Sequence, residues 1–146
     1  MSTAVDARSE RNLAYVHPDL CSVIRAAAQT PQPFTVVYGV RTEAAERVAV
    51  ASGHSHTTHS RHLPQSHENL LACAVDVAAL TANQVDYAKG REAAVFGQIA
   101  AQIKAAAQAL NIPIQWGGEA VGAWTPGVVS TFRDWGHFQL PWETYP

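Results

Sequence analysis

One apolar segment constrains the fold of this 146-residue chain more than any other. Residues 72–80 are apolar at every position except Asp76, and such a run predicts a buried strand. A carboxylate inside an apolar strand is unfavourable unless it is paired or binds a metal ion. Because side chains alternate between the two faces of a strand, Asp76 shares its face with the small residues Ala72 and Ala74, which leaves space above it. The residues alone leave two alternatives open: an Asp that caps a turn or pairs with an Arg, and a metal ligand.

The other segments predict helices and strands joined by short connections. Pro18 and Asp19 favour the start of a helix that stops at Thr30-Pro31. Further helices are expected at about 42–51 and 83–110, and further strands at 34–38, 114–116 and 135–140. The expected inward stripe of the long helix consists of Phe96, Ile99, Ile103, Ala106 and Leu110. This order favours an α+β fold with a small antiparallel β-sheet and packed helices, in a single domain of residues 1–146 with a flexible lead-in at 1–11.

Composition and charge exclude several classes of function. Apolar residues make up 47% of the chain, which is enough to build a core. The formal net charge is -2 and no basic cluster is visible, which argues against a nucleic-acid partner. No apolar run approaches the roughly 18 residues of a membrane span, and the polar N-terminus shows no signal peptide. We therefore expect a monomer made in the cytoplasm, with no membrane insertion, and two free thiols at Cys21 and Cys73 rather than one disulfide.

Histidines are concentrated in one part of the chain. The segment 52–68 is rich in Ser and Thr, has no hydrophobic period and predicts a long loop of the kind that often carries function. Another histidine, His137, is predicted to share a strand face with Gln139. A buried Asp, a strand His and a His-rich loop can supply three ligands, and three protein ligands plus water are typical of catalytic zinc. Five of the seven histidines lie in the loop: His54, His56, His59, His62 and His67.

Several short motifs occur in a specific order along the chain. Each one is weak alone, but together they resemble the zinc peptidases of the hedgehog/D-Ala-D-Ala-peptidase fold, and most closely the phage L-alanyl-D-glutamate endopeptidases, over about residues 12–140. The matching segments are His17-Pro18-Asp19-Leu20, Gly39-Val40-Arg41-Thr42, Ser60-Arg61-His62, Ala74-Val75-Asp76, Trp116-Gly117-Gly118-Glu119 and Asp134-Trp135-Gly136-His137-Phe138.

The resemblance implies a role for each matching residue. His62, Asp76 and His137 would bind Zn2+. Asp134 would be the general base, and Arg41 would stabilise the oxyanion of the tetrahedral intermediate. The implied activity is hydrolysis of the L-Ala–D-Glu bond in peptidoglycan stem peptides, by a phage endolysin that waits in the host cytoplasm and then acts on the cell wall in the periplasm.

Three further residues have looser implied roles, and the sequence departs from the family pattern in places. Ser60 and Arg61 would contact substrate carboxylates, and Glu119 is the alternative base or a partner that orients a ligand. The usual spacing from the first ligand to Asp76 is seven residues, whereas His62 lies fourteen residues before it, so His67 is the alternative first ligand.

Other enzymatic and non-enzymatic classes are less well supported. A D-Ala-D-Ala carboxypeptidase or dipeptidase of the same fold is one alternative, and a non-catalytic wall-binding module is another. Asp134 argues against the second, because binding alone needs no base. No Gly-x-Ser-x-Gly motif or phosphate-binding loop is present, and Cys73 is expected to face the core rather than act as a nucleophile.

Overall fold

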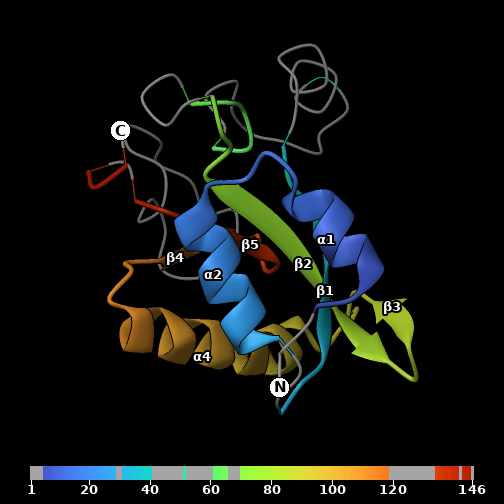
Figure 1. The fold of residues 1–146 in the computed structure, drawn as a ribbon. Helices are drawn as coiled ribbons and strands as arrows, with labels where there is room; N and C mark the ends of the chain where they lie inside the picture. Colours follow the sequence, from blue (N-terminus) through green and yellow to red (C-terminus); the bar gives the residue numbers. More distant parts are fainter. Residues whose placement is uncertain are drawn as a thin grey trace.

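The computed structural model of the chain describes residues 5–28, 31–40, 51, 61–65, 70–118, 134–141 and 143–145. A five-stranded sheet lies at its centre, with strand order β1-β2-β5-β4 and β3 paired to β2 (Figure 1). Every pairing in the sheet is antiparallel. The strands are β1 (Phe34–Tyr38), β2 (Ala74–Thr81), β3 (Gln84–Asp86), β4 (Gln115–Trp116) and β5 (His137–Gln139).

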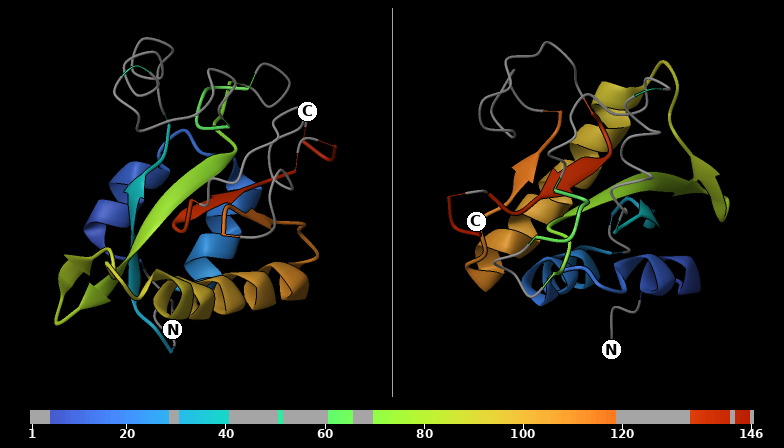
Figure 2. Two further views of the ribbon diagram at one scale, coloured as in Figure 1. Left: turned by 180° about the vertical axis from the view of Figure 1, so that it is seen from behind. Right: turned by 90° about the horizontal axis from the view of Figure 1, so that it is seen from above.

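Among the described residues, the helices that pack with the sheet are α1 (Ala7–Leu13), α2 (Pro18–Ala27) and α4 (Glu92–Leu110). Helices α1 and α2 lie in front of the sheet in the view of Figure 1, and α4 runs beneath it; Figure 2 shows the same arrangement from behind and from above. Helix α1 packs on β1, and α2 packs on α4. The core joins the helices to the sheet through fully buried side chains, among them Val23, Ile24, Val75, Ile99 and Phe138.

The predicted α+β class is confirmed, and most predicted elements occur where they were expected. Strand β1 and the start of α2 match the sequence reading, and the His17 ring accepts a hydrogen bond from the Asp19 backbone N–H as an N-cap. Strand β2 is two residues shorter at its start than the apolar run. Helix α4 ends at the left-handed residue Asn111 as predicted.

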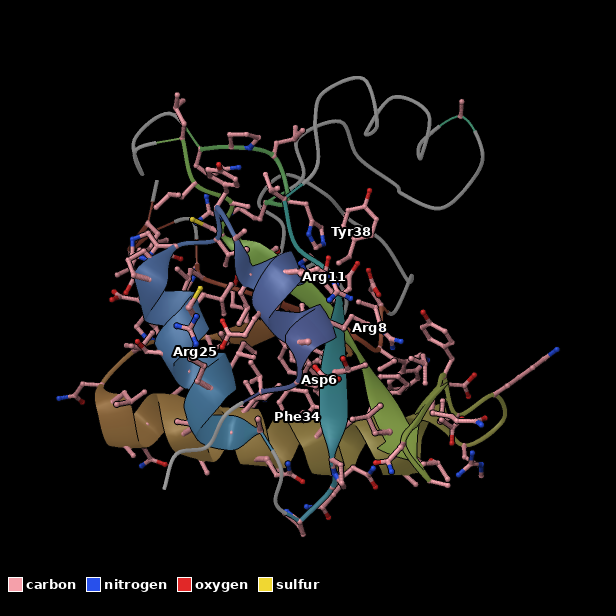
Figure 3. All side chains as sticks on the ribbon, turned by 45° about the vertical axis from the view of Figure 1, so that its right-hand side comes forward. Asp6, Arg8, Arg11, Arg25, Phe34 and Tyr38 are labelled. Atoms are coloured by element: carbon pink, nitrogen blue, oxygen red, sulfur yellow. The ribbon has the colours of Figure 1, made fainter. Side chains whose placement is uncertain are left out.

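The N-terminal segment differs from the expected flexible lead-in. Residues from Val5 onward are described, and Ala7–Leu13 form α1. Asp6 caps this helix by accepting a hydrogen bond from the Ser9 backbone N–H at 3.0 Å, and it also accepts from the Thr35 hydroxyl on β1 at 2.9 Å. Figure 3 shows Asp6 between α1 and β1. The contact with β1, which lies far away in sequence, is the physical reason that this polar segment is ordered.

The long helix begins nine residues later than predicted. Ala82 and Asn83 have φ values of 51° and 65°, and they form a two-residue turn that joins β2 to β3 as a hairpin. Positive φ at both turn residues matches the twist of the flanking strands. The inward stripe of α4 also ends earlier than expected, because Ala107 is buried whereas Leu110, in the last turn, is 43% exposed. The predicted helix at 42–51 lies outside the described residues, apart from Ala51.

Candidate metal centre

Asp76 lies at the point where three strands of the sheet run side by side. Its cross-strand partners are Tyr38 on β1 and His137 on β5. Directly opposed residues of antiparallel strands project to the same face, so the register alone brings the Asp76 and His137 side chains together. Asp76 Oδ1 is 3.2 Å from His137 Nδ1, and the Asp76 side chain keeps 24% of its surface exposed. The predicted strand geometry of these two residues is confirmed, and the Asp76 carboxylate is open to solvent on one side.

His62 reaches the same carboxylate from the segment 61–65, which is fixed to the sheet by its neighbour Arg61. The Arg61 carbonyl accepts from the Cys73 backbone N–H at 2.8 Å, and the buried Arg61 guanidinium donates to the Leu140 carbonyl oxygen at 3.1 Å. These contacts join the segment to one end of the paired β2 and β5 strands, where β2 begins and β5 ends. They place His62 Nε2 3.2 Å from Asp76 Oδ1.

The three side chains have the composition and spacing of a metal site. One ligand atom from each of His62, Asp76 and His137 can be chosen so that all three lie within 4.8 Å of one another. Tetrahedral zinc with bonds of about 2.0 Å requires neighbouring ligand atoms roughly 3.3 Å apart. Both measured His–Asp distances are 3.2 Å, so the residues fit a zinc ion without large rearrangement. Two imidazoles and one carboxylate, with one open side, match a catalytic rather than a closed structural site.

The second nitrogen of each imidazole has an acceptor of its own. His62 Nδ1 lies 2.7 Å from the Gly39 carbonyl oxygen, and His137 Nε2 lies 2.7 Å from Gln139 Oε1. Such contacts fix the ring orientation and leave the other nitrogen to face the metal. Gln139 thus contacts the cluster, although the sequence analysis assigned it no role and noted only that it shares a strand face with His137.

The charges of the cluster support one another. Burial alone would raise the pKa of Asp76, but the adjacent His62 and His137 rings hold it well below its ordinary range. Burial would lower the pKa of His137, but the hydrogen bond to Asp76 and its charge, together with Asp134, raise it. Asp76 is therefore an anion at neutral pH, the form that a metal ligand requires.

Asp134 lies beside the cluster, in the turn that leads into β5. Its Oδ2 atom is 3.9 Å from His137 Nδ1, and 37% of its side chain is exposed. Gly117 holds this turn, because its carbonyl accepts from the Asp134 N–H at 3.0 Å and its N–H donates to the His137 carbonyl at 2.8 Å. A Cβ at Gly117 would overlap the Asp134 backbone oxygen. The Trp-Gly-Gly motif thus has a local explanation: the small residue lets β4 approach the turn that carries Asp134.

The remaining predicted residues are only partly described. Arg61 is 2% exposed, and its described hydrogen bonds are to Gln65 and to backbone carbonyls of Leu140, Pro141 and Tyr145. The predictions for Arg41, Ser60 and Glu119, and for the alternative ligand His67, lie outside the described residues.

Two wider expectations concern thiols and membranes. Cys21 and Cys73 are both buried, and neither forms a disulfide bond, which agrees with the expected thiols. Within the described part of the chain, none of the helices has the length and apolar character of a membrane span.

Comparison with known proteins identifies the family of the chain. Residues 1–140 match the family described as phage L-alanyl-D-glutamate peptidase, and the chain therefore belongs to that family. It is 27% identical over 143 residues to the L-alanyl-D-glutamate peptidase of Escherichia phage T5, which covers 96% of this chain and 99% of that protein. Its fold is similar to the crystal structure of the Serratia marcescens L-Ala D-Glu endopeptidase ChiX, with a TM-score of 0.76, 40% sequence identity, and coverage of 96% of this chain and 91% of that chain.

Proposed function

We propose that this protein is a zinc-dependent endopeptidase that hydrolyses the L-Ala–D-Glu bond of peptidoglycan stem peptides, and that it serves as a phage endolysin. Family membership and the two named relatives support the peptidase activity and its bond. The single observation that supports a metal-dependent mechanism is the convergence of His62, Asp76 and His137 at zinc-ligand spacing.

A bound zinc ion would supply a Lewis acid that activates water and polarises the scissile carbonyl group. The side chains of the protein would supply the general base and the oxyanion contact. Asp134 Oδ2 lies 3.9 Å from a proposed ligand atom and is partly exposed, which supports its role as the base that accepts the proton of an attacking water and passes it to the leaving amine. The motif around Arg41 supports a role for its guanidinium at the developing oxyanion, since Arg stays protonated throughout.

Several finer points remain predictions of this proposal. They are contacts of Ser60, Arg61 and Glu119 with substrate, action as a monomer, a single domain over residues 1–146, and storage in the host cytoplasm before access to the wall. The burial of Arg61 supports a different role for that residue, which is to anchor the segment that carries His62.

Digestion of purified peptidoglycan followed by mass spectrometry of the fragments tests the proposed bond. Wild-type protein should generate stem peptides with a new N-terminal D-Glu. Release of free D-Ala would instead indicate a carboxypeptidase, and the absence of any fragment would indicate a wall-binding module. Asp134→Asn is the matched variant, because it should retain zinc but lose about 10²–10⁴-fold in rate. Full activity in that variant would exclude Asp134 as the base.

A further inference from the structure

The two histidines of the cluster are oriented by acceptors of different kinds. His62 Nδ1 faces the Gly39 carbonyl oxygen at 2.7 Å, so its Nε2 faces Asp76. A backbone carbonyl only accepts hydrogen bonds, so this contact requires a proton on His62 Nδ1 whenever the ring is neutral. The Nε2 lone pair of His62 is therefore free for a metal without the help of any other side chain.

In His137 the roles of the two ring nitrogens are exchanged, and the acceptor is a side-chain amide rather than a backbone carbonyl. Its Nδ1 faces Asp76, and its Nε2 lies 2.7 Å from Gln139 Oε1. A side-chain amide has an oxygen that accepts and a nitrogen that donates, and the two ends have nearly the same shape. If the Gln139 amide were reversed, its N–H would face His137 Nε2 and place the ring proton on Nδ1. That tautomer has no lone pair on the nitrogen that faces the cluster.

Gln115 on β4 contacts the other end of the Gln139 amide. The two residues are direct cross-strand partners in the β4–β5 ladder, and Gln139 Nε2 donates to Gln115 Oε1 at 3.2 Å. A reversed Gln139 amide would bring two acceptor oxygens together at this point. Gln139 is only 1% exposed, so bulk water cannot replace the lost hydrogen bond.

We propose that Gln115 is a positioning residue for the metal centre: by accepting from Gln139 Nε2 it fixes the amide of Gln139, which in turn holds His137 in the tautomer that presents Nδ1 to zinc. This inference rests on the proposed function. It extends the centre beyond the ligands and their immediate acceptors to the edge strand β4, where Gln115 touches none of the three proposed ligands through the hydrogen bonds described here.

Zinc dissociation constants, measured by competition with a chromophoric chelator on the full-length protein, test this chain of contacts. Gln139→Leu removes the acceptor of His137 and should weaken zinc binding about 10–100-fold, as is usual for partners of metal ligands. Gln115→Leu should weaken it by roughly tenfold, near the lower end of that range. Gln115→Glu retains an acceptor oxygen and no donor, so it should bind zinc at least as tightly as wild type. Gln98→Leu, at an exposed position on α4, is the matched control and should leave the affinity unchanged.

The conservative variant separates positioning from a general effect on stability. Melting temperatures of the zinc-free variants are recorded in parallel. Equal zinc affinity in Gln115→Leu and wild type would overturn the proposal, and so would equal weakening in Gln115→Leu and Gln115→Glu with a matching fall in both melting temperatures. If wild-type protein itself bound no zinc, both the proposed function and this inference would be wrong. If wild type bound zinc and Gln115→Leu bound it equally well, only this inference would be wrong.

Discussion

Replacement of Gly39 by alanine is a sharp test of how the fold supports the metal centre. A Cβ at this position would overlap the Asn12 carbonyl oxygen at the end of α1 and lie 3.2 Å from Val16 Cγ2. Real Cβ atoms essentially never lie within 3.0 Å of such neighbours, so the two backbones have to separate. The required shift is on the order of 1 Å, which the close packing of protein interiors does not accommodate freely.

The same shift should disturb His62. Its Nδ1 atom is 2.7 Å from the Gly39 carbonyl oxygen, and a displacement on the order of 1 Å would take this contact beyond the usual limit of about 3.2 Å. We therefore expect two effects of Gly39→Ala: a loss of about 2 kcal/mol in the free energy of unfolding, typical of an overpacked site, and a loss of about 10–100-fold in zinc affinity. For a domain of this size the first effect corresponds to roughly 4–8 °C in melting temperature.

A second glycine provides the control. A Cβ at Gly97, inside α4, would meet nothing within 4 Å. Gly97→Ala should therefore stabilise the protein by about 0.5–1 kcal/mol, because alanine loses less conformational freedom in a helix, and it should leave zinc binding unchanged. The assays are urea denaturation of the zinc-free protein and chelator competition. If Gly39→Ala were as stable as Gly97→Ala and bound zinc like wild type, the link from α1 through Gly39 to His62 would be wrong.

Three further predictions concern Asp6, Arg61 and His137. Burial would raise the pKa of Asp6, but hydrogen bonds from Ser9 and Thr35 outweigh this effect and lower it. The stabilising contribution of Asp6 is therefore complete above the unfolded-state pKa of about 4 and is lost as the pH falls through the lowered folded value. Asp6→Ala should cost about 1 kcal/mol in urea denaturation at pH 7, and an undiminished difference at pH 2 would contradict this cause. Arg61→Met should lower the free energy of unfolding by roughly 2–4 kcal/mol, because it leaves buried carbonyl groups without donors, whereas a variant of normal stability with a raised KM would favour a contact with substrate. Zinc affinity should fall with decreasing pH, because the raised pKa of His137 means that a proton must leave this ring before zinc binds. Zinc dissociation constants measured from pH 8 to pH 5 check this prediction, and a flat profile would exclude His137 as a ligand.

The sequence predicted the face that carries the metal site but not the contacts behind it. Alternation along a strand was enough to place Asp76 with small neighbours and His137 with Gln139, because strand periodicity is a local property. The family motif selected His62 from the five loop histidines, and the structure brings that residue to Asp76. The anchoring of its segment by Arg61 depends on the Leu140 carbonyl, which is 79 residues away in the chain, and no local pattern could reveal it.

The errors in the fold have two origins, one local and one long-range. The hairpin turn at Ala82 and Asn83 uses positive φ at an alanine, a residue that rarely adopts it, so the helical pattern from residue 83 onward was read without a break. Helix α1 was missed because its stability depends on Thr35 and Val36 of β1, which bond to Asp6 and Ser9 across the gap between the two elements. For α1, tertiary contacts outweighed the local preference of the sequence.

Metal content is the most direct test of the central claim that His62, Asp76 and His137 form the zinc site of a peptidoglycan peptidase. Zinc and lytic activity are measured together on purified wild type, His62→Ala, Asp76→Ala and His67→Ala. Wild type and His67→Ala should each hold one equivalent of zinc and degrade cell wall, whereas His62→Ala and Asp76→Ala should lose both. Retention of zinc and activity by His62→Ala, with loss of both in His67→Ala, would contradict the assignment.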